Sequence, residues 1–206
     1  MTKVTPKLLK FDDFIARYGD DERYELIDGE LIDMEPTGPH EEVAAFLMRK
    51  VNVEIDKKSV RWFTPARCLI KPLGILTGFR PDVIVLDKTA LVKEPLWQNE
   101  PVITLGTSVK LVIEVVSTNW QNDYARKVED YSTLGIPEYW IVDYLGLGGR
   151  DYIGDPKQPT ISIYTLSASG NKYQKPVQFR DNDRIISPTF NSLQLTAEEI
   201  FVSAQP

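Results

Sequence analysis

Residues 110–144 read KLVIEVVSTNWQNDYARKVEDYSTLGIPEYWIVDY, and this stretch decides the fold. It opens with the β-branched run Leu111–Val116, which is apolar on both faces, as a buried central strand is. From Asp123 the apolar residues recur at helical spacing until Gly135, which suits the left-handed end of a helix. Residues 138–143 are again rich in aromatic and branched side chains, which is typical of a strand. Strand, helix and strand at this length predict a crossover unit in a sheet that contains a parallel pair.

One carboxylate, Glu114, interrupts the first apolar run. A buried carboxylate without a partner is costly, so we expect Glu114 to have a cation, a hydrogen-bond donor or an opening to water. The polar residues after this strand and the first turns of the helix lie where α/β sheets usually carry their chemistry. The sequence therefore predicts a candidate site beside Glu114.

The composition is that of an ordinary soluble globular chain. Its 206 residues are 42% hydrophobic and 26% charged, which predicts a single domain over residues 1–206, with a core of about residues 24–144 and a C-terminal hairpin and tail over residues 145–206. The single cysteine, Cys68, excludes an intramolecular disulfide framework and favours a cytoplasmic location. No apolar run approaches the roughly 18 residues that span a bilayer. The net charge of −6 argues against a broadly basic surface that coats nucleic acid, although clustered carboxylates that hold metal ions also make a chain acidic.

A hairpin is expected over residues 24–32. Asp28 and Gly29 lie between two alternating runs, which predicts a tight two-residue turn. The register that this turn imposes puts Glu25 and Glu30 on one face of the hairpin. That face is either a solvated surface or part of a site.

The other elements follow from local signals. A cap candidate, a proline and two acids predict a helix start at residues 37–42. His40, the only histidine, lies in that first turn, where a local hydrogen-bonding role competes with a catalytic one. The remaining expected elements are strands over residues 61–73 and 79–87, a C-terminal hairpin from residues 161–166 and 173–179, and a last helix opened by a Thr196–Glu199 capping box.

Asp82 and Glu114 are two carboxylates within otherwise apolar strands. If the strands are neighbours, these carboxylates converge, and their mutual repulsion favours a divalent cation between them. Oxygen ligands suit Mg²⁺ or Mn²⁺, which can polarise a phosphodiester and activate water. Lys127 is the candidate for the positive charge that such a reaction needs, and Asp123, four residues earlier, would orient it. The alternatives are a turn cap for Asp82 and an exposed i,i+4 pair for Asp123 and Lys127.

Several motifs occur in a fixed order. They are DGEL from Asp28, a helix opening at His40, RPDVIV from Arg80, LVIEVVS from Leu111, and the pattern Asp123-x-x-x-Lys127-x-x-x-Tyr131 that continues through GIPEYWIVD. This ordered set, over about residues 24–143, resembles the Uma-type family of restriction-endonuclease-like proteins in the PD-(D/E)XK nuclease superfamily. The resemblance implies an α/β restriction-endonuclease-like fold: a mixed central sheet flanked by helices, with an N-terminal and a C-terminal β-hairpin.

The resemblance also implies an activity, which is Mg²⁺-dependent (or Mn²⁺-dependent) hydrolysis of phosphodiester bonds in DNA. Asp82 would be the metal-binding acid of the PD motif and Glu114 that of the (D/E)XK motif, with the carbonyl of Val115 as a further metal ligand. The rival hypothesis is a non-catalytic module that binds nucleic acid or protein and keeps the fold. The net charge of −6 favours the rival, and the set of candidate residues favours the enzyme.

The sequence departs from the superfamily pattern at one place. The position of the motif's lysine holds Val116, followed by Ser117, which points to Lys127 on the next helix as the displaced lysine. A further acid from before the core would be Glu30 first, and Glu25 second.

Two expectations concern what the chain contacts. Trp120 would either stack on an unpaired base or pack against the sheet edge. A nuclease that cuts both strands of a duplex would match the two-fold symmetry of DNA as a homodimer. The C-terminal tail offers apolar residues for that interface, namely Ile185, Ile186, Phe190 and Leu193.

Overall fold

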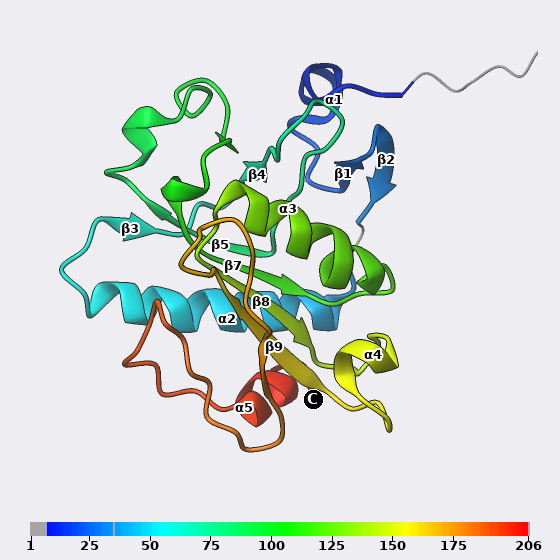
Figure 1. Cartoon of the computed structure of the whole chain (residues 1–206), viewed down its shortest axis with the longest axis vertical. Coiled ribbons are helices and arrows are strands. Elements are labelled where there is room, and N and C mark those ends of the chain that lie inside the picture. The colour runs from blue at the N-terminus through cyan, green and yellow to red at the C-terminus, as the bar shows by residue number, and fades with distance from the viewer. Residues whose placement is uncertain (1–7, 35, 206) are drawn as a thin grey trace, which may run out of the picture.

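The computed structural model describes residues 8–34 and 36–205. Its centre is a six-stranded sheet in the order β10-β9-β8-β7-β5-β3 (Figure 1). The β7 and β8 strands run parallel, and every other neighbouring pair in this sheet is antiparallel. The predicted mixed sheet is therefore confirmed. Its strands are β3 Trp62–Phe63, β5 Val83–Asp87, β7 Val109–Val115, β8 Glu138–Asp143, β9 Thr160–Thr165 and β10 Val177–Phe179.

The predicted crossover unit links β7 to β8. Between them lie a π-helical turn at Asn122–Arg126 and the helix α3 at Lys127–Leu134. Gly135 ends α3 with a left-handed φ of 87°, as the sequence predicts. The sequence predicted one regular helix from Asp123, whereas the first turn is π-helical.

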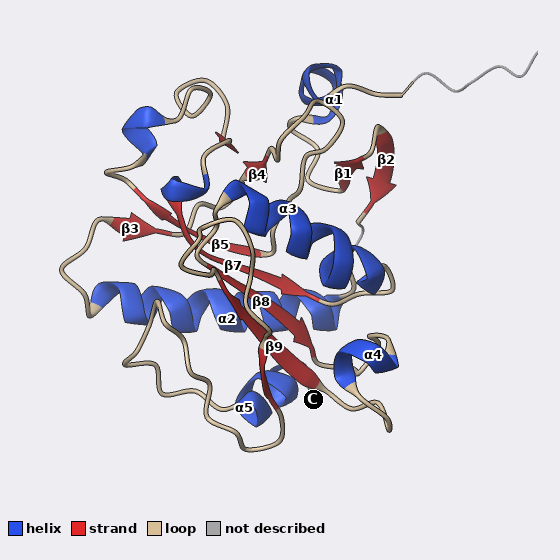
Figure 2. Ribbon diagram, in the orientation of Figure 1, coloured by secondary structure: helices blue, strands red, loops and turns tan. Residues whose placement is uncertain are grey.

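The sheet is covered on both faces, because the strands alternate their side chains between two cores (Figure 2). From β5, Val83 and Val85 pack with the long helix α2, Gly38–Asp56. Ile84 and Leu86 of the same strand belong to the other core, which includes α3.

This alternation fixes the direction of Glu114. Val112 and Val116, which lie two residues before and after it, belong to the core on the α3 side. Since residues two apart on a strand share a face, Glu114 also faces α3. The antiparallel pairing of Val83 with Ile113 then puts Asp82, one residue before β5, beside Glu114.

The N-terminal hairpin has the register that the sequence predicts. It consists of β1 Tyr24–Ile27 and β2 Glu30–Asp33, which follow the helix α1, Phe11–Tyr18. Asp28 and Gly29 form the turn with φ of 50° and 83°, the left-handed pair of a tight hairpin turn.

The prediction of one strand over residues 61–73 is wrong. The structure divides it into β3 and β4, which lie in different sheets: β3 pairs with β5, whereas β4 (Leu69–Ile70) pairs with β6 (Val102–Ile103). Pro65 lies between them and lacks the N–H group that a continuous ladder would use.

The C-terminal hairpin forms from β9 and β10, and α4 (Arg150–Ile153) precedes it. The predicted capping box of Thr196 and Glu199 opens α5, Ala197–Phe201. None of the helices in residues 8–34 and 36–205 is long and apolar enough to cross a membrane.

Most of the tail residues that the sequence offers for a dimer interface are buried within the chain itself. Ile185, Phe190 and Leu193 are buried in the core that contains α2, and only Ile186 is exposed, at 68%. The chain covers its own tail, so these residues give no support to a dimer interface.

Candidate functional site

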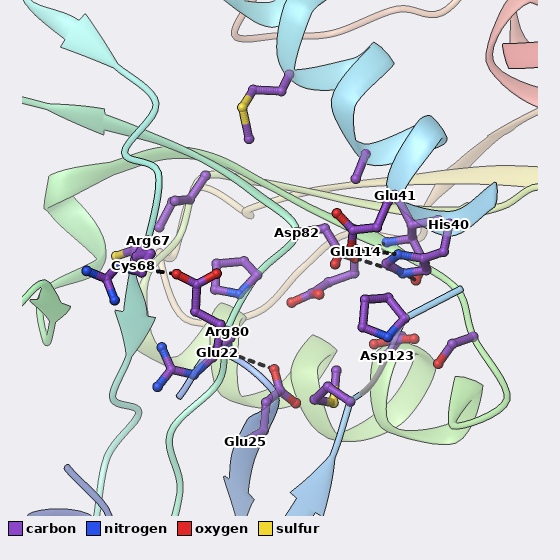
Figure 3. Close-up of a pocket in the computed structure, with 18 of the residues that line it drawn as sticks. Glu22, Glu25, His40, Glu41, Arg67, Cys68, Arg80, Asp82, Glu114 and Asp123 are labelled. Carbon is purple, nitrogen blue, oxygen red and sulfur yellow. Dashed lines mark hydrogen bonds and ion pairs between the residues drawn. The ribbon is translucent and has the colours of Figure 1, made fainter. Parts of the chain in front are cut away.

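A cavity of about 580 Å³ opens where β5 begins and β7 ends. The start of α2, the N-terminal hairpin and residues 65–68 form its walls (Figure 3). Its lining includes nearly all of the predicted site: Glu25, His40, Asp82, Glu114, Val115, Ser117, Asp123 and Lys127.

The ammonium group of Lys127 lies in the middle of three carboxylates. Its Nζ is 3.1 Å from Oε2 of Glu114, 3.2 Å from Oδ1 of Asp123 and 3.4 Å from Oε1 of Glu25. Lys127 and Glu114 are each only 1% exposed, and the ring of Phe79 lies over the ammonium at 5.7 Å. The alternative of an exposed i,i+4 pair for Asp123 and Lys127 is therefore wrong.

Asp123 lies in the π-helical turn and Lys127 directly after it, and both side chains are buried. Arg126, between them, points outward to the carboxylates of Asp28 and Asp130, at 2.9 and 2.7 Å. A π turn widens the helix by one residue, and such turns are frequent at functional sites.

Both carboxylate oxygens of Glu114 have partners. The Tyr131 hydroxyl on α3 donates a hydrogen bond of 2.7 Å to Oε1, and Lys127 faces Oε2. Burial raises the pKa of Glu114 well above its usual range, and the charge of Lys127 offsets part of that rise. In the sequence Tyr131 is marked only as the last residue of the pattern that begins at Asp123, and that pattern does not show its contact with Glu114.

Asp82 and His40 meet at the end of β7. Oδ2 of Asp82 accepts a 2.6 Å hydrogen bond from the Val115 amide, and Nε2 of His40 lies 3.5 Å from the same oxygen. His40 Nε2 is also 2.9 Å from the Val115 carbonyl oxygen, and the His40 amide donates to Thr37 Oγ1 at the start of α2. Burial raises the pKa of Asp82, while His40 and the Val115 amide act against that rise. His40 thus has both the local role and a place in the site.

The structure reverses the predicted ranking of the two hairpin glutamates as site residues. Glu25 is buried, and its Oε1 accepts a 2.6 Å hydrogen bond from the Arg80 amide beside Lys127. Glu30 is exposed and does not line the cavity. Both residues are on one face of the hairpin, but Glu30 is next to the turn at Asp28, whereas Glu25 is at the end that reaches the cavity. The prediction that Glu30 belongs to the site is therefore wrong, and the hairpin acid of the site is Glu25.

Of the remaining candidates, Val116, Ser117 and Trp120, only Ser117 lines the cavity. Val116 is buried and apolar, so the strand offers no cation there, and Ser117 lines the cavity beyond it. Trp120 packs edge-on against Tyr124 and Tyr152, with ring centres 6.3 and 6.0 Å away. Trp120 thus packs against aromatic side chains of the π-helical turn and of α4.

The acids of this cluster outnumber its ammonium. Glu25, Glu114 and Asp123 contact Lys127, and Asp82 lies beside Glu114. Burial raises the pKa of all four acids. The carboxylates together raise the pKa of Lys127 well above its usual range, although burial acts in the opposite direction. Burial thus disfavours the charged form of these acids, and a bound cation would favour it.

The donor set fits a small hard cation. Asp82 and Glu114 offer carboxylate oxygens and Val115 a carbonyl oxygen, and the Asp82 side chain is still 18% exposed. In the described part of the chain, no group of three or more His, Cys, Asp or Glu side chains is arranged to hold a metal ion. Mg²⁺ needs no such cage, because it keeps several waters and is usually held by one or two carboxylates.

Comparison with known proteins gives a family and a fold for the chain. The model of the Uma2 family, described as "Putative restriction endonuclease", matches residues 11–198. A solved structure from Anabaena variabilis ATCC 29413, described as "a putative nuclease belonging to DUF820", has a TM-score of 0.67 at 18% sequence identity, over 95% of this chain and 99% of that one. At this identity the likeness shows the fold. No curated protein matches the chain.

Proposed function

The chain belongs to the Uma2 family of restriction-endonuclease-like proteins, and on this premise we propose that it is a Mg²⁺-dependent (or Mn²⁺-dependent) endonuclease that hydrolyses phosphodiester bonds in DNA. The observation that carries the proposal is the buried contact of Lys127 with Glu114, next to Asp82, at a cavity of about 580 Å³. Acidic oxygens for a metal ion and one fixed ammonium are what hydrolysis of a phosphodiester needs from a protein.

Each residue of the cluster has a distinct part in this proposal. Asp82, Glu114 and the Val115 carbonyl would hold the metal ion, which when bound polarises the phosphodiester and lowers the pKa of a water molecule. Lys127 would neutralise the negative charge that develops on the phosphate. Asp123 and Glu25 keep the ammonium in place by their contacts with Nζ.

Positioning residues support the proposed metal ligands. Tyr131 fixes one oxygen of Glu114, and His40 contacts both Asp82 and the carbonyl of Val115. Neighbours of this kind orient metal ligands in many proteins, and their loss typically weakens metal binding.

A cleavage assay tests the proposal. Supercoiled plasmid and single-stranded DNA are each incubated with the protein and Mg²⁺ or Mn²⁺, next to Asp82→Asn protein purified in the same way. We expect cleavage by the wild type and none by the variant. If the wild type cuts neither substrate with either metal, or if the variant cuts equally well, the proposed activity is wrong.

One observation favours a non-catalytic binding module instead. Lys127 and Tyr131 already occupy both oxygens of Glu114, which leaves the cluster partly neutralised without a metal ion. Calorimetric titration with Mg²⁺ separates the two functions. The enzyme should bind Mg²⁺ and lose that binding in Asp82→Asn, whereas a module of this kind should bind nucleic acid or protein without Mg²⁺.

Homodimerisation and a cytoplasmic location complete the proposal. The two-fold symmetry of duplex DNA is the support for a homodimer, since two copies would place one cluster at each strand. Light scattering at high micromolar concentration measures the assembly, and a monomer there contradicts the dimer.

A further inference from the structure

The cavity lining contains four cationic side chains within the described ranges, and three of them are already engaged: Arg23, Arg80 and Lys127, the fourth being Arg67. Lys127 is surrounded by carboxylates. The guanidinium of Arg80 donates to the carbonyl oxygens of Tyr24, Tyr18 and Gly19, which ties α1 to the hairpin. Lys127 and Arg80 thus have structural contacts within the chain.

Arg23 is also occupied. Its guanidinium lies 4.6 Å from the ring centre of Tyr24, donates to the Tyr24 hydroxyl, and is 3.8 Å from Asp33. It therefore packs along the hairpin.

Arg67 differs from the other three. Its side chain is 51% exposed, and its contact is a single ion pair in which Nε lies 3.2 Å from Oε1 of Glu22. Among the residues that the structure describes, this pair through Nε is the one polar contact of the Arg67 side chain. Figure 3 shows Arg67 and Glu22 at one end of the cavity, with His40 at the other and Asp82 between.

We propose that Arg67 binds a backbone phosphate of the DNA strand beside the one that is cut. The inference rests on the proposed function, which it deepens by naming the residue that holds the substrate. An arginine held at Nε keeps two parallel Nη donors, the fork that fits two phosphate oxygens. Both side chains of the Arg67–Glu22 ion pair are exposed, and ion pairs between exposed side chains are weak.

Electrostatics also favours a phosphate contact at this end of the cavity. The acids around Lys127 repel a DNA strand, and the chain as a whole carries a net charge of −6. An arginine at the far end of the same cavity gives the strand one point of attraction away from those acids. Arg67 would thus set the position of the strand across the cavity, while the cluster carries out the reaction.

Binding measurements as a function of salt test this role. Fluorescence anisotropy is measured with a labelled single-stranded oligothymidylate and a labelled duplex, in Ca²⁺ and at several KCl concentrations. Loss of one phosphate contact reduces the slope of log K against log salt by about 0.7 for a single strand and about 0.9 for a duplex. We expect Arg67→Ala to show that reduction and to bind about tenfold more weakly or worse. Arg67→Lys should keep the slope of the wild type, because it keeps the charge.

Arg150 provides a matched control. It forms a comparable exposed ion pair, with Nη1 3.4 Å from Oδ2 of Asp155 and a side chain 71% exposed, but it does not line the cavity. Arg150→Ala removes the same charge and should leave slope and affinity unchanged. If Arg67→Ala keeps the wild-type slope, or if both variants lose affinity equally, the role of Arg67 is refuted while the proposed function stands. If the wild type binds neither DNA, the proposed function itself fails.

Discussion

Nζ of Lys127 lies 3.1 Å from Oε2 of Glu114, and each of these residues is only 1% exposed. Glu25 and Asp123 contact the same ammonium, so one cation serves three buried carboxylates. Removing one partner of a buried ion pair leaves uncompensated charge in the interior, which costs far more than the loss of a surface pair. The stability of this fold and its proposed chemistry therefore depend on the same lysine.

Lys127→Ala should destabilise the protein by about 3–5 kcal/mol, because three carboxylates lose their buried cation. Arg126→Ala is the control, since Arg126 is the adjacent residue and has its own i,i+4 partner, Asp130, on the outer side of the helix. Arg126 also contacts Asp28, and because both of its ion pairs are partly exposed, each contributes only about 1 kcal/mol or less. Urea unfolding of both variants measures the difference. Equal losses of unfolding free energy would mean that Lys127 is not buried as described.

Asp82→Asn should stabilise the protein while abolishing cleavage. Burial raises the pKa of Asp82 above its ordinary value of 3.8. A carboxyl with a raised folded-state pKa stabilises the fold below its unfolded-state pKa and loses that contribution as the pH rises through the folded-state pKa. The melting temperature of the variant minus that of the wild type should therefore increase from about pH 3.8 towards neutral pH, in the absence of divalent metal.

Asp87→Asn gives the opposite sign and serves as the control. Although partial burial opposes the change, hydrogen bonds from Thr89 and Lys110 lower the pKa of Asp87 to about 2. A lowered folded-state pKa stabilises the fold above the unfolded-state pKa, so this variant should lose stability relative to the wild type as the pH rises from about 2 to 4. Thermal melts over both pH ranges show whether each variant gains or loses stability relative to the wild type as the pH rises. Parallel curves for the two variants would contradict the effect of burial on the Asp82 carboxyl.

Tyr131→Phe should raise the Mg²⁺ concentration needed for half-maximal cleavage by about 10–100-fold, because Glu114 loses the hydroxyl that orients it. Tyr139→Phe is matched to it, since Tyr139 is equally buried but donates to the backbone carbonyl of Asp123, at 3.1 Å. Metal titrations of the cleavage rate separate the variants. A similar metal requirement in both would remove Tyr131 from the site.

Glu25→Gln should slow cleavage, whereas Glu30→Gln should leave it unchanged. Glu25 contacts the ammonium of Lys127, while Glu30 is exposed near the hairpin turn. Initial rates at saturating Mg²⁺ measure both changes. A slower rate for Glu30→Gln alone would restore the order that the sequence favoured.

The sequence predicts the part of this fold that periodicity and turn chemistry determine. A carboxylate inside a branched apolar run marked Glu114, and Asp28-Gly29 determined the hairpin register. The sequence could not rank Glu25 above Glu30, because both have the same alternation and only the contact of the hairpin with the core separates them. Nor could it show that Lys127 is buried. The spacing from Asp123 to Lys127 is the same for a surface pair, such as Arg126 and Asp130, as for an interior one.

The division of residues 61–73 into two strands was missed for a similar reason. Their composition suits a strand throughout, and the partners that separate β3 from β4 come from β5 and from residues 102–103, far along the chain. Tertiary pairing of this kind overrides local preference.

The π-helical turn at Asn122–Arg126 makes the site sensitive to chain length. One residue of helix corresponds to a rotation of about 100°. Deleting a single residue just before Lys127 would relax the turn into a regular helix, a change that the surface of most helices tolerates. It would also bring Asp123 and Lys127 from four positions apart to three, and so disturb the contact of the carboxylate with the ammonium. Insertions and deletions in this short segment should therefore be far less acceptable than substitutions. The number of residues in the turn is as important to the site as the side chains that it carries.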